Sequence, residues 1–243
     1  PRETQSSSAL YLVDRDGANM RMLRAPQAQG LRTPAWSPDG TALYITALDT
    51  EQLADGSYRE RPAILRIDVA SSAEQLFLEN ARDLVLSAIT DQIAYISPNA
   101  SGLGVELRLA ASDGGQHRSL IAADTFEELA APRFAPDGSS LIVAARGEQR
   151  SQGSPLDTLS AWLVPSTAHA HGTPWDIWRV DLASGALHAI TALREDEPHA
   201  AFSPNGSEIV VHGVGGIYRM DVTGTRLRRI DPLGGYGGID WAR

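Results

Sequence analysis

Apolar and polar residues alternate in short runs along most of the chain. The runs Ala42–Thr46 and Ala63–Asp68 are two examples, and similar runs recur towards both ends. Alternation with a period of two is typical of strands that bury one face. Turn residues such as Pro, Asp, Asn and Gly separate the runs. The pattern therefore predicts an all-β chain.

Three of the predicted turns share one motif: an aromatic residue, Ser or Ala, Pro, Asp or Asn, and Gly. The copies are Trp36–Gly40, Phe134–Gly138 and Phe202–Gly206. Pro fixes its own φ angle and the following pair allows a tight reversal, so each copy predicts a turn between two strands. A small unit that recurs with fixed punctuation indicates several copies stacked around a shared core.

Each repeat is expected to contain four strands, which we call a, b, c and d in chain order. In the first repeat they are Pro34–Trp36, Ala42–Thr46, Ala63–Asp68 and Glu74–Leu78. A second repeat lacks the Pro and Gly of the turn but keeps the same order. The strands of the second repeat are expected at 84–87, 93–96, 105–109 and 118–121. Those of the third are expected at 132–134, 141–144, 175–181 and 187–190, and those of the fourth at 201–202, 209–211, 217–221 and 227–230.

The two ends of the chain contain parts of a further repeat. Strands c and d are expected at Leu10–Asp14 and Met20–Leu23, and a strand a at Ile239–Trp241. Pairing of the ends in one closing blade would remove an exposed sheet edge. We therefore expect a β-propeller of about five blades, forming a single domain over residues 1–243. Strand b of the closing blade is missing; it could come from residues upstream of Pro1, the blade could have three strands, or a sixth blade could lie upstream.

The motif copies precede aliphatic b strands, and the c strands carry an aromatic or aliphatic residue, Arg, an aliphatic residue and Asp. Two clear examples are Trp178–Asp181 and Tyr218–Asp221. This combination resembles the TolB-like β-propeller repeat, over nearly the whole chain and most clearly in three copies. The resemblance implies a propeller, often in the bacterial periplasm or cell envelope and often binding proteins, although the cytosol remains open. Its motif residues are structural, so it implies no catalytic residue.

Composition narrows the possible functions. The net charge of -9 argues against binding to nucleic acid, which normally requires a basic face. One dense basic cluster, Arg226, Arg228 and Arg229, alternates with apolar residues and is interpreted as the solvent side of a strand. Cysteine is absent, which excludes disulfides and Cys-based zinc sites. No apolar run approaches the roughly 18 residues of a transmembrane segment.

The strand order separates two kinds of connection. Turns a–b and c–d share one end of the blades, and the b–c and d–a loops share the other. The longest loop, at about 146–174, is an insertion between strands b and c of the third repeat. It could cover the channel and contact a ligand, or it could pack on itself as an Ω-loop held by Trp162.

Several residues near the long loops are candidates for binding a ligand or partner. They are Trp162, His169, His171, Trp175, Asp176, His199, Tyr236 and Arg32. His169 and His171 suggest a metal, since imidazoles two residues apart on an extended segment face the same way. Further ligands lack a fixed spacing, so we expect neither a metal site nor a cofactor. The acidic loop Glu195–Glu197 is interpreted as solvated charge.

These observations favour a non-catalytic module that binds another protein or an extended peptide. No nucleophile elbow or recognisable Ser, His and Asp set is present. One alternative is a lyase or hydrolase that acts on a saccharide or peptide in the channel through His169, His171 and His199. Another is an accessory domain of a larger enzyme. A cluster of titratable groups in one pocket would favour the enzyme. The oligomeric state is left open.

Overall fold

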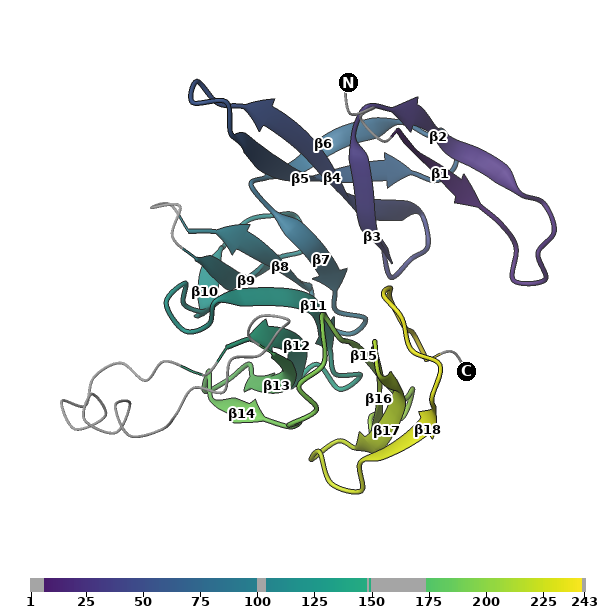
Figure 1. Cartoon of the computed structure of the whole chain (residues 1–243). Helices are drawn as coiled ribbons and strands as arrows, with labels where there is room; N and C mark the ends of the chain where they lie inside the picture. Colours follow the sequence, from purple (N-terminus) through teal and green to yellow (C-terminus); the bar gives the residue numbers. More distant parts are fainter. Residues whose placement is uncertain (1–6, 100–103, 148, 150–173, 242–243) are drawn as a thin grey trace. The chain divides into compact units, whose positions relative to one another are not determined.

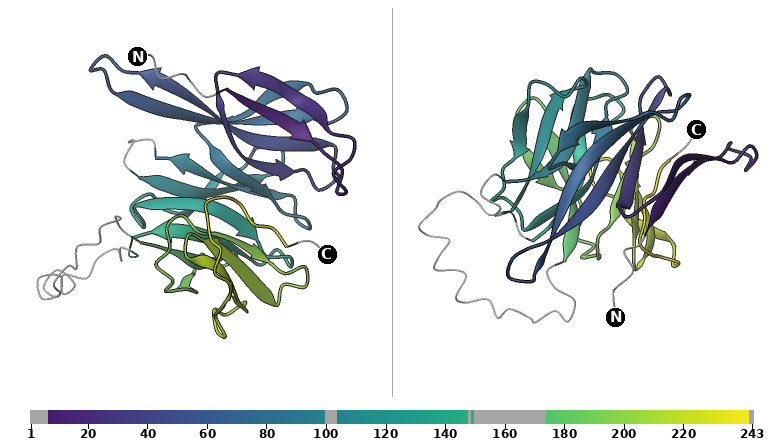
Figure 2. Two further views of the ribbon diagram at one scale, coloured as in Figure 1. Left: turned by 45° about the vertical axis from the view of Figure 1, so that its right-hand side comes forward. Right: turned by 90° about the horizontal axis from the view of Figure 1, so that it is seen from above.

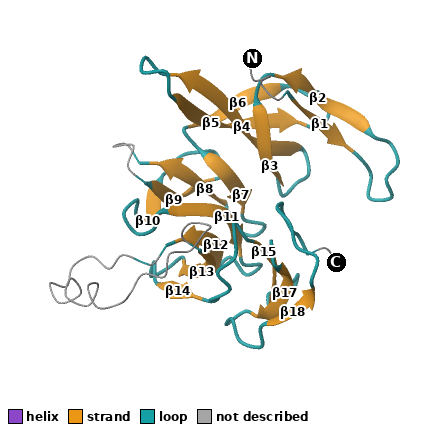
Figure 3. Ribbon diagram, in the orientation of Figure 1, coloured by secondary structure: helices purple, strands orange, loops and turns teal. Residues whose placement is uncertain are grey.

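The computed structural model describes residues 7–99, 104–147, 149 and 174–241. Within these residues the chain forms strands, turns and loops, without any helix (Figure 3). No helix in the described part could therefore cross a membrane. The chain divides into two compact units, Pro1–Ser97 with Arg108–Arg118 and Pro98–Leu107 with Ser119–Arg243. Each unit is described by itself, and a single domain remains a prediction.

The described part of the chain contains eighteen strands (Figure 1). In chain order they are β1 (Ser8–Leu12), β2 (Arg21–Gln27), β3 (Gly30–Trp36), β4 (Ala42–Gln52), β5 (Tyr58–Asp68), β6 (Glu74–Glu79), β7 (Arg82–Leu86), β8 (Gln92–Pro98), β9 (Val105–Ala111), β10 (Arg118–Ile121), β11 (Glu128–Phe134), β12 (Ser140–Arg146), β13 (Trp175–Asp181), β14 (Leu187–Ala189), β15 (His199–Phe202), β16 (Glu208–Gly213), β17 (Gly216–Asp221) and β18 (Arg228–Asp231).

Sixteen of these strands form four sheets of four strands each. Consecutive strands are neighbours in every sheet, so each sheet is a simple meander. We number the sheets as blade 1 (β3–β6), blade 2 (β7–β10), blade 3 (β11–β14) and blade 4 (β15–β18). They correspond to the four repeats read from the sequence, with strands a to d in the expected order. Figure 2 shows the twist of these sheets from two further directions.

The turn motif is built from local hydrogen bonds. In blade 1, the Gly40 amide donates to the Ser37 carbonyl at 2.9 Å, and the Thr41 amide donates to Asp39 Oδ1 at 3.0 Å. Gly40 has a φ of 70°, a left-handed conformation that glycine adopts without steric cost. The Ser37 hydroxyl also accepts a bond from the Ala42 amide at 2.9 Å, which aligns the start of β4.

The same bonds recur in blades 3 and 4. The Gly138 amide donates to the Ala135 carbonyl at 2.9 Å, and the Gly206 amide donates to the Ser203 carbonyl at 2.8 Å. In blade 4, Asn205 replaces the aspartate and its Oδ1 accepts a bond from the Ser207 amide at 3.1 Å. The motif residues therefore shape the turns, as the resemblance implies.

The aspartate that ends the c strand of blades 1, 3 and 4 has a similar local role. Asp68 and Asp181 accept bonds from the amides and hydroxyls of Ser71 and Ser184, at 2.6 to 2.8 Å. Asp221 accepts bonds from the hydroxyls and amides of two threonines, which lower the pKa of its carboxyl to about 2. These carboxylates hold the c–d turns closed.

Blade 1 contains an extension that the hydrophobic pattern did not predict. Strands β4 and β5 pair through to Gln52 and Tyr58, well beyond the expected ends. The extension carries polar residues on both faces, and Glu51 forms ion pairs with Arg59 and Arg61 at 2.9 and 2.7 Å. Because neither face is buried, the strands show no apolar alternation in the sequence.

The two ends of the chain differ from expectation. The sheet that contains β1 has β2 as its only other strand in the described part, and Ile239–Trp241 forms no strand. In blades 1 to 4 every strand a pairs with strand b of the same blade. No strand of the described residues pairs with Ile239–Trp241, so there its backbone lacks the ladder partner that fixes the other a strands.

The second strand of each blade contains the largest number of buried residues. In β12, every residue from Ser140 to Ala145 is buried. In the second unit, the cores of blades 3 and 4 join in one cluster that includes Ile142, Ile177, Ile209 and Met220. Burial of this apolar surface is the main force that holds the sheets together.

Candidate binding site

The long-loop end of blades 3 and 4 holds a group of polar and aromatic side chains that bond to one another and to the nearby backbone. It is formed by the start of β13, the loop 191–198, the β16–β17 turn and the segment 234–238. We call this group the long-loop site. Its residues are Trp175, Asp176, Glu195, Asp196, His212, Tyr218 and Tyr236.

Glu195 lies at the centre of the site. Its side chain is buried, Oε1 accepts a bond from the Tyr218 hydroxyl at 2.6 Å, and Oε2 accepts one from the Gly215 amide at 2.9 Å. These bonds replace the hydrogen bonds to water that the carboxylate loses when it is buried. The bond to Glu195, followed by burial, raises the pKa of the Tyr218 phenol.

Glycines let the β16–β17 turn approach Glu195 closely. A Cβ atom on Gly213 would lie 2.8 Å from the Glu195 side chain, and one on Gly215 would lie 2.6 Å from Glu195 Oε1. The Trp175 amide also donates to the Glu195 carbonyl at 3.0 Å. Glu195 thus joins the loop 191–198 to strand β13 and to the β16–β17 turn.

Asp176 braces the same loop from the other side. Its Oδ1 accepts bonds from the Thr191 hydroxyl at 3.0 Å and from the Arg194 amide at 3.3 Å. The Thr191 hydroxyl in turn accepts a bond from the Ile177 amide at 2.8 Å. Asp176, which the sequence marks as a binding candidate, therefore supports the loop from within the fold.

Trp175 packs into the core beside Asp176. Only 6% of its surface is exposed, and it belongs to the apolar cluster of blades 3 and 4. The Arg146 guanidinium lies 5.6 Å from the centre of its ring, within the range of a cation–π contact. Trp175 anchors the start of β13 rather than presenting an exposed ring.

Tyr236 is the exposed aromatic residue of the site. It is 68% exposed, and its hydroxyl donates to Asp196 Oδ2 at 2.7 Å. This hydrogen bond, together with the charge of Asp196, raises the pKa of the Tyr236 phenol. The ring is therefore held at its polar end while most of its surface meets solvent.

The glycine-rich segment places Tyr236 against the β16–β17 turn. A Cβ atom on Gly234 would come within 2.2 Å of the carbonyl oxygens of Gly213 and Val214, so only glycine fits there. The Gly235 amide donates to the Gly213 carbonyl at 3.1 Å. The ring of His212 makes a further contact, from Nδ1 to the Gly237 carbonyl at 3.1 Å.

The remaining candidates are not gathered here. His199 begins β15 opposite His212 on β16 and is half-buried. Arg32 belongs to the first unit, where it is exposed on β3 opposite Thr46. Trp162, His169 and His171 lie outside the described residues. In the described part, no group of three or more His, Asp or Glu side chains could hold a metal ion.

Sequence reasoning missed the partners of the acidic loop. Glu195 is buried, so the interpretation of this loop as solvated charge is wrong for that residue, while Asp196 is exposed and accepts a bond from Tyr236. Tyr218 was assigned only to strand c of its repeat. The signal in the sequence is the set of glycines at 213, 215 and 234, because close backbone packing requires residues without side chains.

Comparison with known proteins shows similarity of fold only. No protein-family model and no curated protein matches the sequence. The structure is similar to that of a putative TolB from Agrobacterium tumefaciens, with a TM-score of 0.65 and 20% identity, over 93% of this chain and 70% of that one. It is also similar to TolB from Acinetobacter baumannii, with a TM-score of 0.64 and 15% identity, over 92% of this chain.

The chain spans about half the length of the Acinetobacter protein, 49% of it. A chain of the nidogen/laminin complex is similar as well, with a TM-score of 0.67 and 11% identity, over 96% of this chain and 77% of that one. These identities are too low to carry a function across. They confirm the fold class read from the sequence: the chain is an all-β propeller similar in fold to TolB.

Proposed function

We propose that this chain is a non-catalytic propeller that binds another protein or an extended peptide through the long-loop site. The observation that carries the proposal is Tyr236, an exposed aromatic side chain held in place by Asp196 at 2.7 Å. Tyrosine is enriched among the residues that contribute most to protein–protein binding. A ring that is already fixed loses little conformational entropy when a partner covers it.

Apolar residues next to Tyr236 extend the proposed contact surface. Val214 in the β16–β17 turn is 45% exposed, and Leu233 is 78% exposed just before the glycine-rich segment. The close approach of Gly234 to the Val214 carbonyl brings these two segments together. Exposed apolar groups with a polar rim, here Asp196 and Glu197, are typical of a protein-binding patch.

The carboxylates of the site support binding rather than acid–base chemistry. Asp176, Glu195 and Asp196 each accept hydrogen bonds that hold loops in place. A general acid or base must instead offer its carboxyl group to a substrate. The internal bonds make these groups part of the scaffold that positions Tyr236.

The proposed location is the bacterial periplasm or cell envelope, and the proposed partner is a protein of that compartment. The resemblance of the repeats to TolB-like propellers motivates this part of the proposal. Trp162, His169, His171 and His199 remain candidates for a contribution to the same partner, and Arg32 remains a binding candidate of the first unit.

A site-specific photocrosslinker provides the test. p-Benzoylphenylalanine would replace Tyr236 in one variant and Tyr58 in a control variant, since Tyr58 has nearly the same exposure, 70%, but lies at the tip of the blade 1 extension. Irradiation in the native host should give adducts of defined mass at position 236 and not at position 58. The same pattern at both positions, or adducts at neither, would rule out this surface.

A deletion tests whether the inserted loop contributes to binding of the partner. Removal of residues 150–172 should weaken the capture of the crosslinked partner if Trp162, His169 and His171 contribute. Unchanged capture would remove those three residues from the proposal and leave the Tyr236 surface intact.

A further inference from the structure

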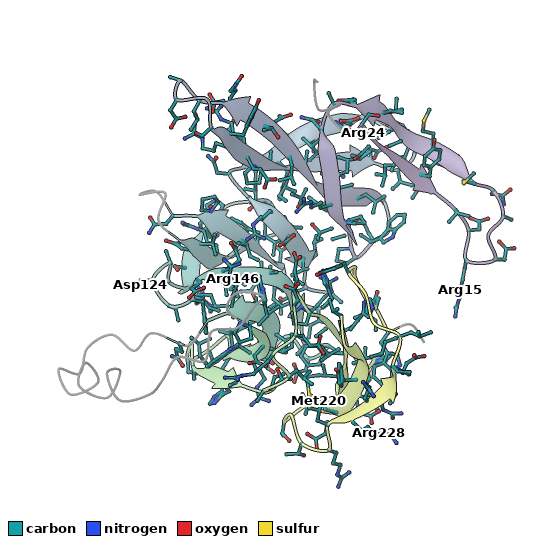
Figure 4. The ribbon with its side chains drawn as sticks, in the orientation of Figure 1. Arg15, Arg24, Asp124, Arg146, Met220 and Arg228 are labelled. Carbon is teal, nitrogen blue, oxygen red and sulfur yellow. The ribbon has the colours of Figure 1, made fainter. Side chains whose placement is uncertain are left out.

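A second feature of the second unit lies at the short-turn end of blade 4. There a hollow of about 520 Å³ is lined by Glu208, Arg219, Asp221, Arg226 and Arg228, among others. Two arginines come from the start of the outermost strand and its preceding turn. Figure 4 shows Arg228 on β18, with Met220 on the neighbouring strand β17.

The acidic residues of the hollow already have partners. Glu208 forms a two-point ion pair with Arg219, with nitrogen–oxygen distances of 2.9 and 2.5 Å. Asp221 is bound by Thr223 and Thr225 of the c–d turn. Arg219 also stacks at 5.5 Å from the centre of the Trp241 ring.

Arg226 and Arg228 are different. In the part of the chain that the structure describes, no carboxylate lies within ion-pair distance of either guanidinium. Guanidinium groups without a carboxylate are well suited to bind an external anion, because their N–H groups match the geometry of a carboxylate. The hollow therefore carries an excess of positive charge on a chain whose net charge is -9.

Backbone groups lie beside these arginines. Strand β18 is the last strand of its sheet and pairs with β17 alone among the described strands. One edge of β18 thus presents N–H and C=O groups that can pair with an added strand. Ile230 on the same strand is 51% exposed.

Blade 3 provides an internal comparison. A hollow of about 390 Å³ occupies the corresponding place and is lined by Arg179, Asp181, Ala186 and His188. Ala186 and His188 stand where blade 4 has Arg226 and Arg228. The hollow therefore occurs in both blades, but of the two only blade 4 has arginines at both of these positions.

The geometry points to a second binding surface in which an acidic, extended peptide segment adds to the free edge of β18 and pairs its carboxylates with Arg226 and Arg228. Main-chain hydrogen bonds to β18 would hold the segment, and the two arginines would select acidic side chains. This surface lies at the opposite end of blade 4 from Tyr236, so it does not depend on the long-loop site.

Fluorescence anisotropy with labelled peptides of about ten residues tests the inference. An alternating Glu–Val peptide should bind at low salt and dissociate as salt is added, while a Lys–Val peptide should not bind. The Arg226→Gln/Arg228→Gln variant should bind the Glu–Val peptide roughly fivefold to tenfold more weakly. Arg194→Gln, which removes one positive charge at the long-loop end, should bind like the wild type.

A Glu–Pro peptide of equal charge separates strand addition from simple charge attraction, because proline lacks the N–H group that a strand must donate. Its binding should be much weaker than that of the Glu–Val peptide. Equal binding of both peptides, or equal binding by the wild type and the double arginine variant, would overturn the inference. Circular dichroism and thermal melting would verify that the variants fold, and Tyr236→Ala should leave this binding unchanged.

Discussion

The two ends of blade 4 are held together in different ways. At the short-turn end, the Ser203 and Asn205 side chains bond to groups two to five positions away in the sequence. At the long-loop end, Glu195 and Asp196 bond to residues 20, 23 and 40 positions away. The short-turn end is stabilised by bonds within a single repeat, whereas the long-loop end forms only when segments distant in the sequence come together.

This difference separates the contacts that form the common scaffold from the contacts that are specific to one blade. Local turns recur in blades 1, 3 and 4 because each needs only its own few residues. Contacts between distant segments can differ from blade to blade without loss of the repeat. Loops that are positioned by a rigid scaffold are the usual place for binding residues.

Glu195→Ala should give the largest effect, because it removes the acceptor of two bonds at the long-loop end. We expect a loss of about 2–3 kcal/mol in the free energy of unfolding, since the Tyr218 hydroxyl and the Gly215 amide would lose their partner. Denaturant titration measures this loss. Glu197→Ala is the control and should change stability by less than about 0.5 kcal/mol. Equal effects of the two variants would mean that the Glu195 bonds are not important for stability.

Gly40→Ala should have a smaller effect at the short-turn end. The added methyl group meets no atom within 4 Å, so the cost arises from the φ of 70° alone and amounts to about 1 kcal/mol. Gly40→Asn should cost less, because asparagine tolerates this conformation better. Thermal unfolding of both variants tests the order. A reversed order would show that backbone conformation does not decide the stability of this turn.

Acid should weaken the short turns of blades 1 and 4 as their aspartates become protonated. Hydrogen bonds from Ser37 and Thr41 lower the pKa of Asp39 to about 2, and the threonines near Asp221 do the same for that carboxyl. A lowered pKa means that the stabilisation is present above the ordinary value near 3.8 and is lost as the pH falls towards 2. Unfolding measured between pH 5 and pH 2 should show a shallower loss in the Asp39→Asn/Asp221→Asn variant. An unchanged slope would contradict this assignment.

Tyr236→Phe should cause the smallest change in stability, because the bond to Asp196 is exposed to solvent. The raised pKa of Tyr236 adds a second readout. A raised phenol pKa stabilises the fold below the ordinary value of 10.0, and this contribution is lost at higher pH. Asp196→Asn should move the pKa of Tyr236 back towards that value in an NMR titration. A pKa that does not move would exclude Asp196 as the cause.

Much of the fold could be predicted from the sequence. The strand order of blades 1 to 4 and their turns follow from alternation and from the repeated Pro, Asp and Gly positions, which act over a few residues. The extension of β4 and β5 could not be predicted, because Asp49–Gln52 shows no apolar alternation. Ile239–Trp241 has an apolar pattern but pairs with no strand in the part of the chain that the structure describes, so the pattern alone was not sufficient to form a strand there.

The candidate site was predicted less well. Tyr236 was named as a binding candidate, but its bond to Asp196 spans 40 positions and leaves no local trace in the sequence. Trp175 and Asp176 were chosen for their chemistry, and the structure uses them as a core anchor and a loop brace. The type of a residue suggests which chemistry it could carry out, but its burial and its bonding partners determine the role that it has in the structure.

The sequence by itself determined the all-β class, the fourfold order of strands and the turn geometry, since each depends on the conformational preferences of neighbouring residues. Only the tertiary structure decided that Glu195 is buried, that the glycines at 213, 215 and 234 pack against other segments, and that Tyr236 is held while exposed. Those outcomes depend on which distant segments meet, and that is set by the packing of whole sheets rather than by any local run of residues.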